Sequence, residues 1–513
     1  NMYNFSMSVR LSQGRRSQLP CALPWHCRGS MPAELESVVS VSRMVYNVYK
    51  NSNFHQAHPF SRTGNTAFMN NRGLTGGIAM RIERDLLGER EVPAHVYYGI
   101  QTLRALENFP ITGHRVHPEF IHALGLVKAA CAQANVDRGA LAPELGSAIV
   151  RAAQEVAAGQ WDAEFVVDPI QGGAGTSLNM NANEVIANRA LELLGYDKGR
   201  YDVIHPIMHV NMAQSTNDVI PTALRVALWK LSAQTVEELS RLAQAFFDKA
   251  REYADVWKVG RTHLQDAVPI ALGRELEAYG RVLQRDADRI RQAACELRWI
   301  NIGGTAVGTG LNADDRYRVR VVEILREKTG LDLASAPDLV DATQNQDVLV
   351  ALSQAAKAAA VDLSKIASDL RMMSSGPRAG LAEISLPAVQ PGSSIMPGKV
   401  NPVIPEVVNQ VAFQVMGNDL TVTLAAQAGQ FELNVMLPVL SYNLIQSLEI
   451  LRQACRVFRD RCVVGIKVNR ERLRQQLESS IGMVTALNPY IGYEKATEVA
   501  KEALETGRPV WEI

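Results

Sequence analysis

Leu349-Val-Ala-Leu-Ser-Gln-Ala-Ala-Lys-Ala-Ala-Ala-Val-Asp-Leu-Ser-Lys-Ile-Ala-Ser-Asp-Leu370 is the stretch that decides the fold. Its apolar residues step by three and four, a spacing that places them along one stripe of an α-helix. The stripe consists of Leu349, Leu352, Ala356, Ala359, Leu363, Ile366 and Leu370. Two further segments have this spacing, namely Leu276, Tyr279, Leu283, Ala287, Ile290, Ala294 and Leu297, and Ile445, Leu448, Leu451, Cys455, Phe458 and Cys462.

Two more long helices are expected at about residues 219–257 and 404–428. Helices of about 30 residues are roughly 45 Å long and need partners along their whole length. We therefore expect a mainly α-helical protein built on an elongated bundle of five helices. Small residues off the main stripe, such as Ala355 and Ala358, would let another subunit approach closely. A thicker monomeric bundle is the alternative.

Length and composition limit the classes of protein. A chain of 513 residues suggests roughly three domains. Its 53 basic and 53 acidic residues balance, so no global charge favours nucleic acid or a membrane surface. No apolar run reaches the roughly 18 residues of a membrane span. The six cysteines have neither zinc nor disulfide-framework spacing, which favours reduced thiols in a cytoplasmic protein.

Residues 1–79 differ in composition from the rest of the chain. They contain eight Arg or Lys residues against two acids, Glu34 and Glu36. An Arg-rich, acid-poor segment is typical of a transit peptide. Because no amphipathic helical pattern is present, we favour an extension without a structural role, and Met80 would be a natural start for the globular part of the chain.

The segment Gly392-Ser-Ser-Ile-Met-Pro-Gly-Lys-Val-Asn-Pro402 carries the most chemistry. It predicts a mobile loop that brings Ser393, Ser394, Lys399 and Asn401 in front of a helix start. We expect Asn401 as the N-cap and Pro402 as the first helical residue. Free N–H groups there would favour an anion, so a serine could act as a base. The simpler interpretation is a turn that caps a helix.

Three other segments combine polar side chains with helix ends. Gln171–Ser177 precedes a helical pattern and is a plausible carboxylate site, or simply a capped loop. Gln214–Asp218 holds more polar groups than one cap needs. Gly260–Asp266 lies at a break between two long helices, and its His263 is a candidate acid, base or ligand, or a structural histidine.

Nucleotide and metal sites are not indicated. The spacing around Lys399 is not that of a P-loop, and Ile302–Gly310 lacks the Gly-x-Gly-x-x-Gly order of a dinucleotide site. We find no HExxH sequence and no Asp, Glu and His cluster at metal spacing. We therefore expect neither a cofactor nor a metal.

Taken together, these segments resemble the aspartase/fumarase superfamily. Gly392–Pro402 is similar to its signature loop, and Gln171–Glu184, Gln214–Asp218 and Gly260–Asp266 resemble its other blocks in the expected order. The stretch from Tyr98 to Gly113 resembles the aspartase branch. The resemblance runs from about Arg81 to the end of the chain, where the family continues for a few more helical segments. We therefore expect a shortened C-terminal domain.

The resemblance implies a three-domain helical subunit whose five-helix bundles form the twenty-helix core of a homotetramer. We expect an extension at 1–79, an N-terminal domain at 80–217, a central bundle at 218–470 and a small C-terminal domain at 471–513. Each active site would draw residues from three subunits.

The implied reaction is the reversible elimination of ammonia from L-aspartate to give fumarate, without a cofactor. By resemblance, Ser393 is the base that forms an aci-carboxylate intermediate. The β-carboxylate is expected at Thr176, Ser215, Thr216 and Ser394, the α-carboxylate at Lys399 and Asn401, and the amino group near Asn217, Thr262 and His263.

Two alternatives remain open. A class II fumarase would add water instead of ammonia at a similar dicarboxylate site, although the segments Tyr98–Gly113 and Gln171–Ser177 favour ammonia. A non-catalytic helical structural protein of the same descent is the alternative of another class.

Overall fold

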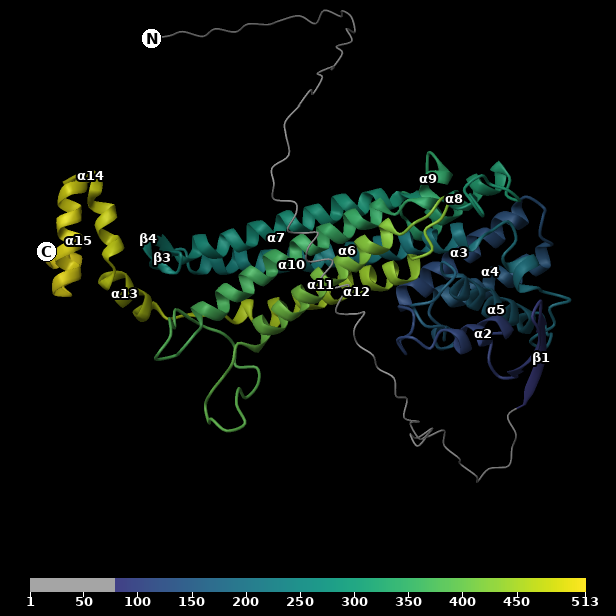
Figure 1. Cartoon of the computed structure of the whole chain (residues 1–513), viewed down its shortest axis with the longest axis horizontal. Helices are drawn as coiled ribbons and strands as arrows, with labels where there is room; N and C mark the ends of the chain where they lie inside the picture. The colour runs from purple at the N-terminus through teal and green to yellow at the C-terminus, as the bar shows by residue number, and fades with distance from the viewer. Residues whose placement is uncertain (1–78) are drawn as a thin grey trace, which may run out of the picture. The chain divides into compact units, whose positions relative to one another are not determined.

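The structure is a computed structural model that describes residues 79–513, so the expected extension lies almost wholly outside the described part of the chain. The described residues belong to one compact unit. Figure 1 shows that this unit is mainly helical, with long helices running side by side. Within the described part, no helix is both long and apolar enough to cross a membrane.

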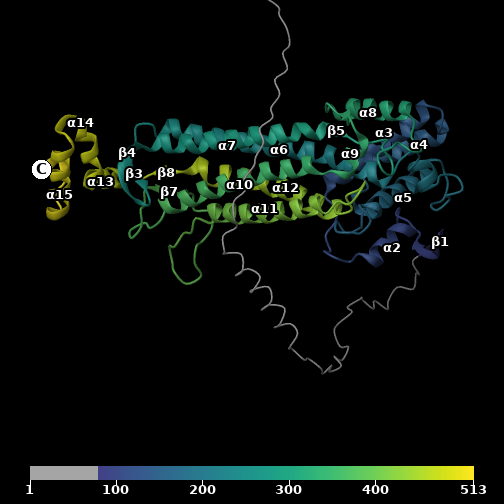
Figure 2. The same cartoon turned by 45° about the horizontal axis from the view of Figure 1, so that its top comes forward.

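The five expected long helices are all present and form a bundle (Figures 1 and 2). Their lengths of 24 to 37 residues confirm the prediction from apolar spacing. They are α6 (Thr216–Glu252), α7 (Leu272–Cys295), α10 (Asp347–Met373), α11 (Val403–Gln427) and α12 (Leu437–Arg461).

The predicted stripes are the faces on which these helices pack. In α10, every residue of the stripe from Leu349 to Leu370 is at most 1% exposed. The stripe meets α7 on one side and α11 on the other, and α11 in turn packs on α12. Burial of one such leucine contributes about 1.5–3 kcal/mol, so the four leucines of the stripe make a large favourable contribution to the bundle.

The N-terminal part of the described chain packs around the beginning of α6. Helix α3 is mostly buried because it lies between α4, α6 and α8. A π-helical turn, η2 (Pro206–Val210), leads toward the start of α6. The elements here are β1 (Met80–Asp85), β2 (Gly88–Pro93), α2 (Ile100–Asn108), α3 (Pro118–Asp137), α4 (Pro143–Ala157), η1 (Asp162–Glu164), α5 (Thr176–Leu193) and α8 (Asp315–Thr329).

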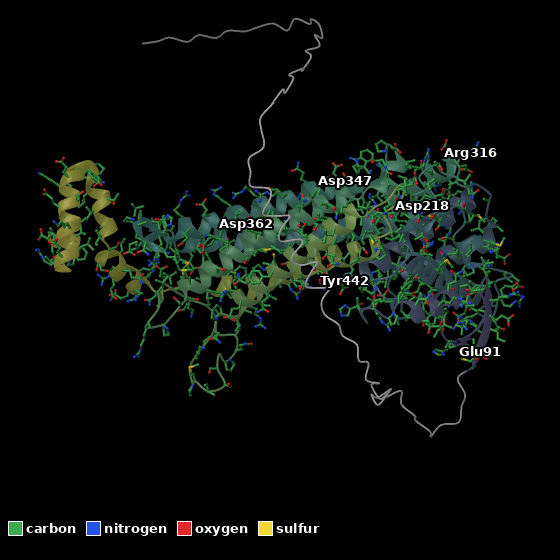
Figure 3. The ribbon with its side chains drawn as sticks, viewed as in Figure 1. Glu91, Asp218, Arg316, Asp347, Asp362 and Tyr442 are labelled. Carbon is green, nitrogen blue, oxygen red and sulfur yellow. The ribbon has the colours of Figure 1, made fainter. Side chains whose placement is uncertain are left out.

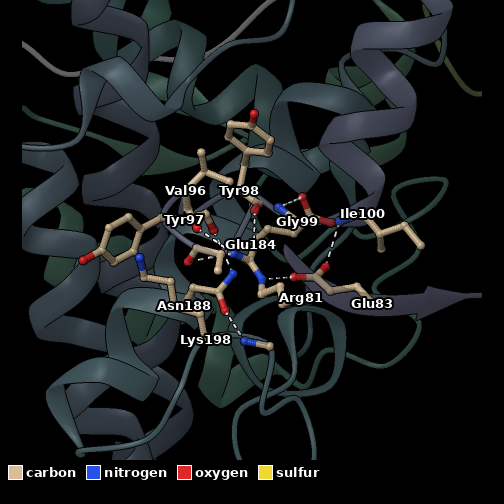
Figure 4. A network of polar contacts seen from close by, with 12 residues as sticks. Arg81, Glu83, Val96, Tyr97, Tyr98, Gly99, Ile100, Glu184, Asn188 and Lys198 are labelled. Atoms are coloured by element: carbon tan, nitrogen blue, oxygen red, sulfur yellow. Dashed lines mark hydrogen bonds and ion pairs between the residues drawn. The ribbon is translucent and has the colours of Figure 1, made fainter. Parts of the chain in front are cut away.

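Two buried carboxylates, one on α5 and one on β1, hold the start of α2 in place (Figure 4). The Glu184 carboxylate accepts hydrogen bonds from Gly99 N at 2.8 Å and Thr102 Oγ1 at 2.6 Å. Glu83 accepts from Ile100 N at 2.8 Å. Both therefore satisfy the free N–H groups at the start of α2. Burial raises the pKa of Glu184 to about 7.

The opposite end of α6 and α7 carries a hairpin that we did not predict. Helix α6 ends at Glu252 rather than near 257, and strands β3 (Trp257–Thr262) and β4 (Gln265–Ala271) follow. The remaining elements are η3 (Glu296–Arg298), β5 (Trp299–Ile300), β6 (Ala334–Ser335), α9 (Leu339–Gln344), β7 (Ile384–Ser385), η4 (Val463–Gly465), β8 (Lys467–Val468), α13 (Arg470–Ser479), η5 (Ile481–Leu487), α14 (Asn488–Ile491), α15 (Tyr493–Thr506) and η6 (Val510–Glu512).

Candidate active site

Thr176 is the first residue of α5 and follows a strained turn. Gly173, Ala174 and Gly175 have φ angles of 85°, 57° and 94°. This left-handed region suits glycine but is unusual for alanine. The Thr176 side chain is exposed and its Oγ1 donates to Gly173 O at 2.7 Å. The turn therefore presents a hydroxyl beside the free N–H groups of a helix start, where an anion is favoured.

The start of α6 brings together Ser215, Thr216 and Asn217, as predicted for a helix entry. Ser215 is the N-cap and accepts from Asn217 N at 3.2 Å. Thr216 Oγ1 accepts from Asn179 Nδ2 at 3.1 Å, and Asn217 Nδ2 donates to Ala306 O at 2.7 Å. All three site residues are partly accessible, so their side chains are available to a ligand.

Below this helix start lie two buried ionisable residues. The sequence did not point to Lys128, and it gave Asp218 no role. Asp218 closes the capping box and also accepts from Gly303 N at 3.1 Å and Thr305 N at 3.0 Å. Burial raises the pKa of Asp218 to about 6. Figure 3 shows Asp218 where the bundle meets the N-terminal helices. Its contacts hold the 303–305 segment against the start of α6.

Thr262 and His263 lie at the tip of the β3–β4 hairpin and are exposed. Thr262 pairs with Gln265 across a two-residue turn. The turn residues His263 and Leu264 have φ angles of 53° and 61°, the signature of a type I′ turn. Such turns usually hold Asn or Gly, so this one is strained, and strain of this kind often marks a functional position.

The hairpin is fixed to the polypeptide that leads into the Ser393 loop. The buried Glu383 carboxylate lies 2.5 Å from Arg261 Nη1 and 2.9 Å from Lys258 Nζ. Both cations belong to β3, whereas Glu383 lies just before β7. The root of the Ser393 loop and the Thr262 hairpin are therefore at the same end of the bundle.

Within the loop, the Ser393 hydroxyl oxygen accepts two backbone hydrogen bonds. Its Oγ lies 3.2 Å from Ile395 N and 3.0 Å from Met396 N. Two N–H donors on one oxygen favour its ionised form. The loop closes through Gly392 N, which donates to Lys399 O at 2.8 Å. Ser394 and Lys399 are exposed.

The predicted cap at the end of this loop is wrong. Pro402 is the N-cap and α11 begins at Val403. Asn401 does not cap the helix, because its Nδ2 donates to Gly392 O at 2.7 Å. The amide thus fastens the two ends of the loop together.

The structure gathers the predicted residues in two separate places rather than one. Thr176 and the Ser215–Asn217 turn lie near the start of α6, and Thr262, His263 and the root of the Ser393 loop lie beyond its end. Because α6 has 37 residues, the two groups are about 55 Å apart along its axis.

The part of the chain that the structure describes contains no preformed set of metal ligands. Across residues 79–513, no group of three or more His, Cys, Asp or Glu side chains is arranged to hold a metal ion.

Comparisons with known proteins identify the family. Residues 88–417 match the lyase family profile, and residues 483–513 match the fumarase C C-terminus profile. The chain is 59% identical to an aspartate ammonia-lyase of Bacillus sp over 434 residues, which is 85% of this chain and 93% of that protein. It is 56% identical to the aspartate ammonia-lyase of Bacillus subtilis strain 168, over 86% of this chain and 93% of that protein.

Solved structures agree with the sequence comparison. A fumarate lyase:delta crystallin from Brucella melitensis superposes with a TM-score of 0.83 at 51% identity, covering 85% of this chain and 95% of that one. A class II fumarase from Schistosoma mansoni gives a TM-score of 0.82 at 36% identity, covering 85% and 94%. The chain therefore belongs to the lyase family typified by fumarases and aspartases, and it is a carbon–nitrogen lyase of that family. Within it, the chain falls in the aspartate ammonia-lyase branch.

Proposed function

We propose that this chain catalyses the reversible anti-elimination of ammonia from L-aspartate to give fumarate. The observation that carries the mechanism is the pair of backbone N–H groups on Ser393 Oγ. These donors stabilise the alkoxide that must form before Ser393 can remove a proton from the carbon beside the β-carboxylate. The aci-carboxylate dianion that results is then stabilised by oriented hydrogen-bond donors.

These hydrogen-bond donors would come from both groups of residues, the one near the start of α6 and the one beyond its end. Thr176, Ser215 and Thr216 stand at helix starts, where N–H groups and hydroxyls suit the β-carboxylate, with Ser394 added from the loop. Lys399 and Asn401 would hold the α-carboxylate, and Asn217, Thr262 and His263 would surround the amino group. The exposed Ile395 and Met396 side chains, 83% and 48% accessible, would exclude water when the loop closes on the substrate.

We propose that the active site forms only between chains, in a homotetramer. A single chain holds Ser215 and the Ser393 loop at opposite ends of α6, so one copy cannot surround one substrate. Helix α11 exposes an apolar stripe that suits a second copy. Its members Phe413, Leu420 and Leu424 are 62%, 61% and 51% exposed, and Gly417 between them faces open space, with no atom within 4 Å of where a Cβ would stand.

This proposal also assigns roles to the parts of the chain. We propose that residues 80–217 supply the Thr176 and Ser215 groups, residues 218–470 the tetramer core with the hairpin and loop, and residues 471–513 a small helical domain. A cytoplasmic location also remains our proposal. It is supported by Cys131, Cys295, Cys455 and Cys462, which are free thiols.

The test separates ammonia from water as the group eliminated. Purified protein mixed with L-aspartate should produce fumarate, followed by its ultraviolet absorbance. Fumarate with ammonium should return L-aspartate, whereas fumarate in water alone should give no malate. Malate formation would favour the fumarase alternative, and a tetramer without either reaction would favour a structural protein.

A further inference from the structure

Lys128 is a buried amine beside the candidate site. It lies in α3 with no exposed surface. Its Nζ donates to Asn211 Oδ1 and to Gln214 Oε1, each at 2.9 Å. Both acceptors are uncharged, and among residues 79–513 no carboxylate lies within 4 Å of this nitrogen. A buried ammonium without a counter-ion is costly, and burial accordingly lowers the pKa of Lys128 to about 7.

Hydrogen bonds connect this amine to the start of α6. Asn211 Oδ1 also accepts from Asn179 Nδ2 at 3.2 Å, and the same Nδ2 donates to Thr216 Oγ1 at 3.1 Å. Gln214 directly precedes the N-cap Ser215. Lys128 is therefore three hydrogen bonds from a residue expected to touch the substrate, although it is not itself exposed to the site.

Two other titratable groups face this amine, Cys131 of α3 and Asp218 of α6, and Tyr317 of α8 in turn lies beside Cys131. Burial raises the pKa of Cys131 to about 12 and that of Tyr317 well above its usual value. Asp218, with its pKa raised to about 6, is bonded to three backbone N–H groups. Above neutral pH, Lys128 is thus the group of the four that gains a proton most readily.

We propose that Lys128 takes up one proton from solvent when a dicarboxylate binds against the starts of α5 and α6. The amine lone pair accepts the proton, a buffer acid releases it, and the new ammonium offsets the negative charge of the ligand. A unit charge about 8 Å away shifts a pKa by one to two units at an effective dielectric constant of about 20, which is sufficient to drive this step. Lys128 acts through Asn211 and Gln214 and is therefore a positioning residue.

The same charge would act during turnover. The proposal rests on the proposed function, in which the dianionic aci-carboxylate intermediate carries more negative charge than L-aspartate. An ammonium that forms below the helix starts therefore stabilises the intermediate more than the substrate, which is the condition for faster catalysis.

The test is calorimetry of succinate binding, because succinate is a four-carbon dicarboxylate that cannot lose ammonia. The titration is done near pH 8 in two buffers of different ionisation enthalpy, and the difference in heat gives the protons taken up. With the pKa of Lys128 raised by one to two units, the wild-type protein should take up about 0.4 to 0.8 of a proton at pH 8, and its affinity should fall by up to about tenfold per pH unit above about pH 7. Binding without proton uptake overturns the role of Lys128 alone. No binding of succinate, together with no fumarate from L-aspartate, overturns the proposed function as well.

Variants assign the proton to one side chain. Lys128→Met should bind succinate without proton uptake and with a flat dependence of affinity on pH. Lys128→Arg keeps a cation that does not titrate, so it should bind without uptake even if the methionine variant fails to fold. Lys328→Met, which changes an exposed lysine on α8, should behave as wild type. Full proton uptake by either Lys128 variant would assign the proton elsewhere and contradict the proposal.

Discussion

Ser215 and Thr262 lie beyond opposite ends of the same helix, α6, which holds them about 55 Å apart. The Ser393 loop belongs to the Thr262 end, because Glu383 at its root binds Arg261 of β3. The residues proposed to hold one substrate can therefore meet only when ends of different chains come together. The sharing of active sites that we propose would thus follow from helix length as well as from family membership.

Subunit complementation follows from this separation. Ser215→Ala and Ser393→Ala should each be nearly inactive alone. Unfolded together in equal amounts and refolded, they should recover about a quarter of the wild-type rate, because half of the chains at random carry each intact residue. Recovery of no activity, with each variant refolding to a tetramer alone, would mean that both serines act within one chain.

The exposed stripe of α11 should hold the tetramer together. Leu420→Lys places a charge in the middle of this stripe and should produce smaller assemblies by size-exclusion chromatography with light scattering. Val319→Lys is the control, since Val319 is a similarly exposed apolar residue on α8. Equal masses for both variants and the wild type would exclude the α11 face from the interface.

The two glycines of the Ser393 loop should differ in their tolerance of a side chain. A Cβ on Gly392 would lie 2.4 Å from Lys399 O and 2.7 Å from Asn401 N, which prevents loop closure. Gly392→Ala should therefore lower kcat by about 10²-fold while the fold is retained, as expected for a misplaced catalytic group. Gly398 has a φ of 80° but open space around it, so Gly398→Ala should lower kcat much less than Gly392→Ala does. A larger loss of kcat in Gly398→Ala than in Gly392→Ala would contradict the closed geometry of the loop.

Asp286 should make stability depend on pH. It is fully buried on α7, and burial together with the negative charge of Asp362 on α10 raises its pKa to about 6. The folded state therefore binds a proton that the unfolded state releases, and the free energy of unfolding should fall as pH rises from about 4 to about 6. Denaturant titrations at one protein concentration should show this slope, and Asp286→Asn should make it shallower without removing it, because Glu184 and Asp218 also have raised pKa values. An unchanged slope would place the titrating group elsewhere.

The helices were predictable because their apolar spacing is regular over many turns, as in the stripe from Leu349 to Leu370. The helix entry at Gln214–Asp218 was predictable because local polar residues satisfy local N–H groups, although the sequence did not single out Ser215 as the cap. The β3–β4 hairpin was not, since its turn holds His263 and Leu264 instead of the expected Asn or Gly. Lys128 was also missed, because one lysine in an apolar helix does not reveal that its amine finds Asn211 and Gln214, more than 80 residues away.

The Ser393 loop was predicted correctly in one respect and wrongly in another. The sequence indicated Ser393 and its glycines correctly as a turn before a helix, but not the use of Asn401. Capping is a local preference, whereas the bond from Asn401 to Gly392 O depends on how the whole loop closes. The catalytic and binding roles of these residues stay predictions.

Removal of the Ser393 hydroxyl tests the account most directly. Ser393→Ala should fold and assemble as the wild type does but should form fumarate from L-aspartate at least about 10³-fold more slowly. Ser479→Ala, which removes an exposed hydroxyl at the end of α13, should leave the rate unchanged. A Ser393→Ala protein that turns over L-aspartate at a near-normal rate would show that another group removes the proton.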